Sequence, residues 1–453
     1  MPRRKWPLLL VALTAVSATG GASGEHWAVI VAGSRGYENY RHQADACHAY
    51  HVARRHGIPA ENVVLMMYDD VATAKENPFP GKLYNRATTS AEKNAAEDVY
   101  AGCHADYAGE HVTPANFLSV LASGPDDRVF VNFVDHGARG FVVFPCGQML
   151  TASQLTGTME TMYKQKRYHE LVLYVEACHS GSMFWSWSMS RINAYVTTAA
   201  NGWESSWGTY CPPLDTVGGV PLGTCLGDLY SVSWMEDSDK TDLSSESLEQ
   251  QFRLVKHETR KSHVEQFGSS HVRKEIVGDF LSNYDLPAMA NGEAHGLKQD
   301  EVLTRREGSA VDAHDISLTL AFYKYLRSPV GPKRSKSAAE LIRLIQERQR
   351  ADVLFRSICQ AFQDAYGEEL RPAGMKNDSP TSCDAEVFLR FGRLVTTQLG
   401  ETQASDMPPG FTSYSLQYAG ILTDLCARLG TINAVDAVLK RAIISAPSVV
   451  EVQ

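Results

Sequence analysis

Short, continuously apolar segments that alternate with amphipathic ones are the feature that most constrains the fold of this chain. Apolar runs typical of fully buried strands begin at His26 and recur at 62–67, 128–134, 171–175 and 194–197. Helices are predicted between them at about 39–55, 114–122 and 153–165. Strands that are apolar on both faces and alternate with helices indicate an α/β fold, a mostly parallel sheet with helices on both sides. In such sheets, ligands and catalytic groups gather at the carboxyl ends of the strands.

The chain changes character after about residue 286. Glycine and proline pairs with dense charge between 286 and 336 predict a partly exposed connector. Apolar residues at helical spacing predict helices at 337–366, 384–399, 413–428 and 432–445. The predicted division is therefore a catalytic domain at 25–287, a connector at 288–336 and an all-helical C-terminal unit at 337–453.

The first residues have the layout of a signal peptide. Basic residues precede an apolar run from Trp6 to about Val16, and small residues follow through Gly20. We predict a signal peptide at 1–24, cleaved at about 18–24. The apolar run is shorter than the ~20 residues that a membrane-spanning helix needs, and no later segment is long and apolar enough, so no transmembrane segment is expected.

Charge and cysteine content restrict the function further. The whole chain carries −9, residues 1–24 carry +3, and residues 333–453 contain equal numbers of basic and acidic residues, so residues 25–332 carry −12. This charge excludes the basic field that nucleic-acid binding requires. The cysteines number nine, so pairing in an oxidising secretory route leaves at least one thiol, which is a candidate nucleophile.

Two predicted strands run directly into reactive side chains. The strand at 128–134 is followed by Asp135-His136-Gly137, and the strand at 171–175 by Glu176-Ala177-Cys178-His179. An imidazole beside a cysteine lowers the pKa of the thiol by holding a thiolate–imidazolium pair, and then protonates the leaving amine. The backbone N–H groups of Gly137 and Cys178 are candidate donors to a developing oxyanion. A structural strand-end histidine and a buried thiol fit the same spacing, so spacing alone leaves both interpretations open.

Six short motifs occur in a fixed order along the chain. They are Asn39-Tyr-Arg-His-Gln-Ala-Asp45, Asp69-Asp70, Asp135-His-Gly137, Glu176-Ala-Cys-His-Ser-Gly-Ser182, Thr197-Thr-Ala-Ala-Asn201 and Leu226-Gly-Asp-Leu-Tyr-Ser-Val232. The set resembles the legumain family of asparaginyl endopeptidases, from about His26 to Phe267 and more weakly beyond. The resemblance implies a caspase-like, mostly parallel sheet flanked by helices, followed by an all-helical C-terminal prodomain. It also implies a cysteine endopeptidase that cleaves after Asn, and after Asp at acid pH.

The resemblance gives each matching residue a role. The implied catalytic residues are Cys178 as nucleophile, His136 as its partner, Asn39 supporting the histidine, and Gly137. The implied pocket for the residue before the scissile bond (S1) consists of Arg41, Glu176 and Asp228, with Ser205 and Ser206 on the substrate-binding strand edge. A carboxamide offers one acceptor and two N–H donors, so a guanidinium beside two carboxylates suits asparagine. An ionised aspartate would face those carboxylates unpaired, whereas a protonated one resembles asparagine. His179 is interpreted as part of the pocket rim.

The remaining cysteines are partly assigned by the same resemblance. It implies a disulfide Cys211–Cys225 across a plant-type loop and a second, Cys383–Cys426, in the prodomain. Cys47, Cys103, Cys146 and Cys359 stay unassigned, and Cys47 is interpreted as a small buried residue of the first helix. The segment from 115 to 127 is shorter than its counterpart in the family, which leaves substrate preference beyond S1 open.

The resemblance also implies how the protein is made and controlled. It implies a secreted zymogen of the lysosome, vacuole or extracellular space, without metal or other cofactor. The implied partners are protein and peptide substrates with exposed Asn, cystatin-type inhibitors, and the chain's own prodomain. We expect residues from about 337 onward to block the site until carboxylates protonate, with the basic segment 333–356 held against the acidic catalytic domain. No asparagine lies near Ser328, so Asp312 and Asp315 are candidate self-cleavage positions.

Other classes fit parts of the pattern. A GPI-transamidase-like catalytic subunit shares the implied fold and dyad, but it matches the motifs around Arg41 and Cys178 less well and usually ends in a membrane segment. A non-catalytic binding relative is a second alternative, which the intact Cys178, His136 and Asn39 argue against. Peptide ligation is an expected side activity, because an acyl-enzyme can be taken by an amine in place of water.

Overall fold

The computed structural model describes residues 24–89, 96–121, 124–185, 191–282, 299–370, 382–399 and 407–445. The predicted signal peptide lies outside the described residues, apart from Gly24. Within the described ranges, no helix has both the length and the apolar character needed to cross a membrane. We call residues 24–282 the α/β unit, residues 299–327 the connecting segment and residues 332–445 the C-terminal helical unit.

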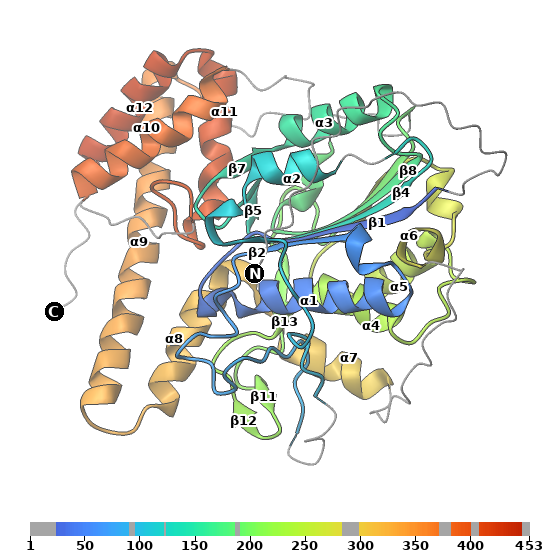
Figure 1. Cartoon of the computed structure of the whole chain (residues 1–453). Coiled ribbons are helices and arrows are strands. Elements are labelled where there is room, and N and C mark those ends of the chain that lie inside the picture. Colours follow the sequence, from blue (N-terminus) through green and yellow to red (C-terminus); the bar gives the residue numbers. More distant parts are fainter. Residues whose placement is uncertain are drawn as a thin grey trace.

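A seven-stranded sheet forms the centre of the α/β unit (Figure 1). Its order is β14 (Glu265–Gly268), β9 (Ala194–Thr198), β8 (Glu170–Glu176), β4 (Arg128–Val134), β1 (His26–Ala32), β2 (Val63–Met67) and β3 (Tyr107–Ala108). Every neighbouring pair is parallel except the antiparallel pair β14–β9. The five long strands predicted from the sequence are confirmed.

Helices cover both faces of this sheet because successive strand residues point to opposite sides. Ala28 and Ile30 of β1 join a core with α1 (Tyr40–Arg55), α4 (Leu229–Ser238), α5 (Leu248–Glu258) and α6 (Gly278–Leu281). Val29 and Val31 join a second core with α2 (Pro114–Val120) and α3 (Ala152–Lys164). The predicted α/β class is confirmed.

Smaller sheets lie at the carboxyl edge of the main sheet. One contains β5 (Gly137–Ala138), β6 (Phe141–Val143) and β7 (Met149–Thr151). Another contains β13 (Gly227–Asp228), β10 (Trp207–Thr209) and β15 (Val311–Asp312). A hairpin of β11 (Thr216–Val217) and β12 (Val220–Pro221) projects from the loop between β10 and β13.

The part of the predicted connector that the structure describes is more ordered than expected. It forms α7 (Gln299–Gly308), β15, α8 (Ile316–Arg327) and the first turn of α9 (Pro332–Tyr366). Arg306 of α7 is 2% exposed, and its guanidinium donates to Glu258 (2.7 Å) and Ser233 (3.1 Å). The dense charge that indicated an exposed connector therefore includes a buried ion pair, which sequence composition does not distinguish from a solvated one.

The C-terminal helical unit is all-helical, as predicted. It contains α9, α10 (Ser382–Leu399), α11 (Ala419–Leu429) and α12 (Ile432–Ser445), and α9 runs from a hairpin with α8 into the bundle (Figure 1). Its core includes Phe355, Ile358 and Phe391, and it continues into the α/β unit, where the rings of Phe141 and Phe388 lie 5.1 Å apart. The bundle therefore packs directly on the β5–β6 hairpin.

Three disulfides are present in the described residues. Cys211–Cys225 and Cys383–Cys426 were predicted and are confirmed. Cys47 of α1 is buried, as predicted, but its pairing was left unassigned, and it is bonded to Cys103 in the loop before β3. The partners lie 56 residues apart, and only the packing of that loop against α1 brings them together.

Candidate active site

The ends of β4 and β8 bring His136 and Cys178 to one edge of the sheet. The strands pair in parallel up to Val134 and Glu176, and the Asp135 N–H donates to the Glu176 carbonyl at 3.0 Å. A side chain at Gly137 would place its Cβ 2.6 Å from the Cys178 carbonyl oxygen. Glycine at 137 therefore permits the close approach of the two segments.

Cys178 ends β8 at a sharp turn. The next residue, His179, has a φ of 57°, and a short 3-10 helix, η5 (Ser180–Met183), follows. Cys178 is 2% exposed, and its sulfur lies 3.4 Å from the backbone nitrogen of Ser206. The turn thus presents the thiol to the edge of β10, where Ser206 is buried and Ser205 half-buried.

Asn39 fixes the proton of His136. The Asn39 amide donates to the Arg35 carbonyl at 2.9 Å, so its oxygen faces His136 Nε2 at 2.8 Å and accepts from it. Burial, Arg41 and His314 hold the pKa of His136 well below its usual range. The ring is therefore neutral, with its proton on Nε2 and Nδ1 left as an acceptor. Among the described residues, no hydrogen bond joins it to Cys178.

Arg41, Glu176 and Asp228, predicted apart in sequence, form one buried group. Arg41 Nε donates to Asp228 Oδ1 at 2.9 Å, and Glu176 Oε2 accepts from the Ser231 N–H (3.0 Å) and hydroxyl (3.1 Å). The second oxygens, Glu176 Oε1 and Asp228 Oδ2, are buried without a hydrogen-bond partner among the described residues. The group therefore has acceptor oxygens available beside a guanidinium.

A third carboxyl group belongs to this site and was missed from the sequence. Asp45 accepts from the Asp228 N–H at 3.1 Å and from Asn85 at 2.6 Å. Burial raises the pKa of Asp45 and Glu176 well above the usual range, and the charge of Asp228 adds to both shifts. Burial also raises the pKa of Asp228, against the opposing effect of Arg41. One guanidinium thus lies among three carboxyl groups, and burial and mutual repulsion disfavour the ionised form of each.

His42 was also missed. Its ring lies 5.0 Å from that of His136, and its Nδ1 is 2.6 Å from the Ser34 hydroxyl. His42, Asp135 and His136 place ligand atoms within 4.8 Å of one another, a spacing that suits a metal ion, but hydrogen bonds already orient both rings. The signal for these residues was present in α1, whose polar positions 41, 42, 43 and 45 are all buried instead of forming one solvated face.

The connecting segment occupies the strand edge beside Cys178. Val311 and Asp312 pair antiparallel with Gly208 and Trp207, and the Ala313 N–H donates to the Ser206 carbonyl at 3.0 Å. Ile316 packs within the small apolar cluster that contains Cys178 and the Cys211–Cys225 disulfide. An extended peptide thus fills the strand edge beside the Cys178 thiol.

His314 follows this peptide and was not predicted as a site residue. Its Nδ1 donates to the Ser413 carbonyl at 2.7 Å. Burial opposes its charge, but the neighbouring Cys178 sulfur prevails and raises the pKa of His314 to about 9. In this arrangement His314 lies near enough to Cys178 for the sulfur to raise its pKa, whereas the described residues show no hydrogen bond between His136 and Cys178.

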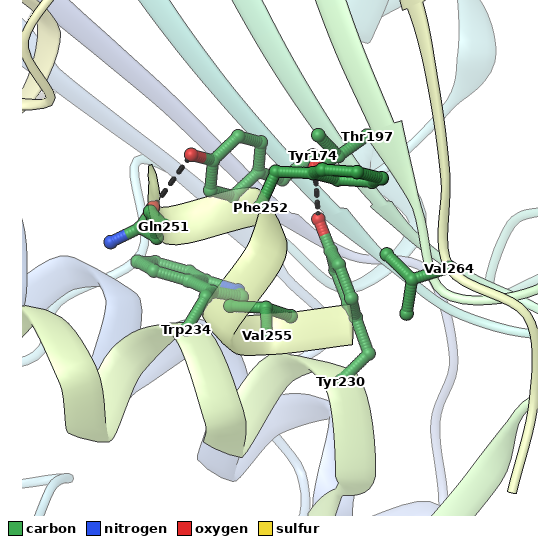
Figure 2. Close-up of a pocket in the computed structure, with 8 residues that line it drawn as sticks. All are labelled: Tyr174, Thr197, Tyr230, Trp234, Gln251, Phe252, Val255 and Val264. Carbon is green, nitrogen blue, oxygen red and sulfur yellow. Dashed lines mark hydrogen bonds between the residues drawn. The ribbon is translucent and has the colours of Figure 1, made fainter. Parts of the chain in front are cut away.

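A small cavity lies between β8–β9 and helices α4 and α5 (Figure 2). Its volume is about 10 Å³, room for roughly one water molecule. The hydroxyls that line it are paired, Tyr174 with Gln251 (2.7 Å) and Tyr230 with Thr197 (2.5 Å). The cavity is therefore a core packing feature, and none of the predicted site residues lines it.

A cysteine and a histidine at one sheet edge, beside a buried guanidinium and three carboxyl groups, are the parts that a cysteine endopeptidase needs, and comparison with known proteins assigns the chain to that class. The Peptidase C13 family model matches residues 26–284, and the chain belongs to that family. It is 36% identical over 436 residues to the vacuolar-processing enzyme delta-isozyme of Arabidopsis thaliana, covering 90% of this chain and 88% of that one. It is 48% identical over 273 residues to legumain of Mus musculus, covering 57% of this chain and 59% of that one.

Among solved structures, caspase-1 from Spodoptera frugiperda matches with a TM-score of 0.33 and 10% identity over 61% of this chain and all of that one. This overlap is too weak to add to the fold assignment, which rests on the sheet itself and on the family.

Proposed function

We propose that this endopeptidase hydrolyses peptide bonds after asparagine, and after aspartate at acid pH. The observation that carries the proposal is the buried group of Arg41, Glu176 and Asp228, with its acceptor oxygens beside a donor. A carboxamide can accept from the guanidinium and donate to the carboxylates, so each polar atom finds a partner. An ionised aspartate would add a further negative charge to a group that already disfavours it, whereas its protonated form donates as an amide does.

The chemistry follows from the two strand ends. Cys178 sulfur attacks the carbonyl carbon after its proton passes to Nδ1 of neutral His136, and Asn39 stabilises the resulting imidazolium through Nε2. The Gly137 and Cys178 N–H groups bind the oxyanion. When the C–N bond breaks, His136 gives its proton to the leaving amine, and a thioester remains. Water then releases the acid and restores the thiol, and an amine in place of water gives ligation.

We also propose that the intact chain is a zymogen and that the C-terminal helical unit is its prodomain. Support comes from residues 311–316, which fill the strand edge beside Cys178, and from the α8–α9 hairpin that holds them. Arg327 of α8 forms an ion pair with Asp215 of the α/β unit. Asp424 of α11 forms a second ion pair, with Arg139 of the same unit. Both contacts would have to break before the C-terminal helical unit could leave the α/β unit.

The basic segment 333–356 contributes differently from the expectation. Within the described residues, its ion pairs reach the connecting segment, Lys324 with Glu340 and Arg348 with Asp315, and do not reach the α/β unit. Asp312 and Asp315 are held in the occluding peptide, so self-cleavage at either position requires prior release.

The cellular setting remains part of the proposal. Three disulfides suit an oxidising compartment, and a lysosomal, vacuolar or extracellular location fits both the acid requirement and a predicted signal peptide. Substrates would be proteins and peptides with exposed Asn, and cystatin-type proteins are candidate inhibitors.

Paired peptides test the specificity. Acid-treated protein should cleave a peptide with one asparagine after that residue and leave its alanine counterpart intact. An aspartate counterpart should be cleaved at pH 4 to 5 but not at pH 7. Equal cleavage of the alanine peptide would contradict the proposal.

A further inference from the structure

The turn after Gly137 carries an arginine that the mechanism does not use. Arg139 lies between β5 and β6, and the next residue, Gly140, donates its N–H to the Ser182 hydroxyl at 2.9 Å. Ser182 in turn donates to the His179 carbonyl at 2.6 Å. The Arg139 turn is thus tied to the loop that follows Cys178, which fixes the backbone from which the guanidinium extends.

Two tryptophans form an aromatic surface beside the Arg139 guanidinium. The Arg139 guanidinium lies 5.2 Å from the ring centre of Trp203, and the ring of Trp185 lies 4.8 Å from that of Trp203. Trp203 remains 47% exposed. The neighbouring Glu204 is turned away, because its carboxylate accepts from His263 and from the Asn201 N–H. A cation therefore lies against an aromatic surface without a competing carboxylate from this loop.

The direction of the bound peptide shows which side of the scissile bond this is. Residues 311–313 run antiparallel along β10 toward Cys178, and His314 lies beyond the nucleophile, its ring 6.0 Å from that of His179. The other edge of β10 is paired with β13, so the edge that β15 uses is the one left for a substrate, and residues 311–313 are our guide to its direction. Its residues after the scissile bond then extend toward His179, Trp203 and Arg139.

A carboxylate already occupies this place in the intact chain. Asp424 of α11 is bonded to Arg139, which also donates to the Gly420 carbonyl and lies 3.5 Å from the Thr423 hydroxyl. The carboxylate side chain is 7% exposed and the guanidinium side chain 15% exposed. A Cβ at Gly420 would lie 2.8 Å from the guanidinium, so glycine at this position of α11 leaves room for the Arg139 side chain. The C-terminal helical unit thus supplies a model of a carboxylate ligand.

We propose that Arg139, backed by Trp203 and Trp185, is a specificity site for an acidic side chain at the first or second residue after the scissile bond, and that Asp424 occupies it in the zymogen. This inference rests on the proposed function, since a substrate reaches Arg139 only after the helical unit has left. Residues 25–332 carry −12, so no long-range field favours acidic peptides. A preference for them must come from a local cation.

The test uses the activated enzyme and peptides with one asparagine, followed by Glu or Gln at the first or second position after it. At pH 6 a free glutamate is ionised. The kcat/KM ratio of Glu over Gln should be roughly tenfold in the wild type at one of the two positions, the scale of one charge-assisted hydrogen bond. Arg139→Gln should bring the ratio to about one, and Arg139→Lys should keep part of it.

Two further variants distinguish a substrate-binding site from a contact that only holds the C-terminal helical unit in place. Asp424→Asn should loosen the zymogen but leave the ratio of the activated enzyme at the wild-type value. Arg253→Gln, which changes an exposed arginine of α5, should alter neither property. If the activated wild type cleaves after Asn with equal rates for Glu and Gln, the specificity site is refuted and the proposed function stands. If no Asn peptide is cleaved at all, both fail.

Discussion

The two halves of this molecule use charge in opposite ways. In the α/β unit, α1 buries Arg41, His42 and Asp45 against one edge of the sheet, and the network around Asp228 and Glu176 leaves little room for change. In the C-terminal helical unit, an apolar core around Ile358 and Phe391 is surrounded by exposed charges. A buried polar network needs every partner in place, whereas an apolar bundle keeps its fold when its surface contacts are lost. The first suits a rigid active site, and the second suits a unit that can detach.

The largest effect should follow loss of the nucleophile. Cys178→Ser should lower cleavage after Asn by at least about 10⁴-fold, because a hydroxyl beside His136 is not ionised as a thiol is. The intact protein should still be secreted and folded, since the substitution is nearly isosteric. Turnover within tenfold of the wild type, measured with an Asn peptide after activation, would refute the assignment of Cys178.

A substitution in the buried network around Arg41 should have the next largest effect. Arg41→Ala leaves Asp228, Glu176 and Asp45 without their cation, a loss on the order of 3–5 kcal/mol for a broken buried pair. Selectivity for Asn over Gln should disappear, and the melting temperature should fall. Lys440→Ala on α12, which removes an exposed i,i+4 pair with Asp436, is the matched change in the other half and should shift stability by less than about 0.5 kcal/mol. Similar losses from both variants would break the comparison.

The disulfides extend the comparison to stability. Replacing Cys47 and Cys103 together by alanine should lower the free energy of unfolding of the α/β unit by about 2–4 kcal/mol. The transition of the C-terminal helical unit, followed separately after its release, should not move. Replacing Cys383 and Cys426 together should lower the free energy of unfolding of the C-terminal helical unit and leave the transition of the α/β unit unchanged. Differential scanning calorimetry of the separated parts checks this, and a shift of both transitions in either double variant would contradict it.

The smallest effect concerns His314 and pH. Its pKa is about 9 in the blocked state, above the ordinary value near 6.5, so the blocked state binds the proton more tightly. This contact therefore holds the peptide fully below pH 6.5 and is lost as the pH rises through 9. His314→Gln should remove a contact that opposes acid opening, and the midpoint of activation should rise by roughly half to one pH unit. A midpoint that falls would show that His314 promotes opening.

The parts of this molecule that the sequence predicted are those with a local signal. The strands from His26 and up to Val134 are continuous apolar runs and followed from pattern. His136 and Cys178 stood out because they lie directly at strand ends, but their proposed catalytic roles came from family resemblance. The S1 residues and two disulfides came from family resemblance, because nothing local joins Arg41 to Asp228 across 187 positions.

The parts that were missed depend on contacts between distant segments. Cys47 pairs with a residue from a loop that carries no pattern, and Arg306 is charged yet buried by Glu258. His314 comes to Cys178 only because residues 311–313 add to β10. Composition describes the average environment of a residue, and these three have environments made by tertiary packing.

The most direct test of the account is the activity of the purified intact chain toward Asn and Ala peptides between pH 7 and pH 4, with gels of the same samples. The account predicts no cleavage of either peptide at pH 7, then loss of the C-terminal helical unit on acidification together with cleavage of the Asn peptide only. Cys178→Ser protein should remain intact under the same conditions unless active wild type is added. Full activity of the uncut chain at pH 7 would contradict the account, because residues 311–316 would then leave the nucleophile accessible.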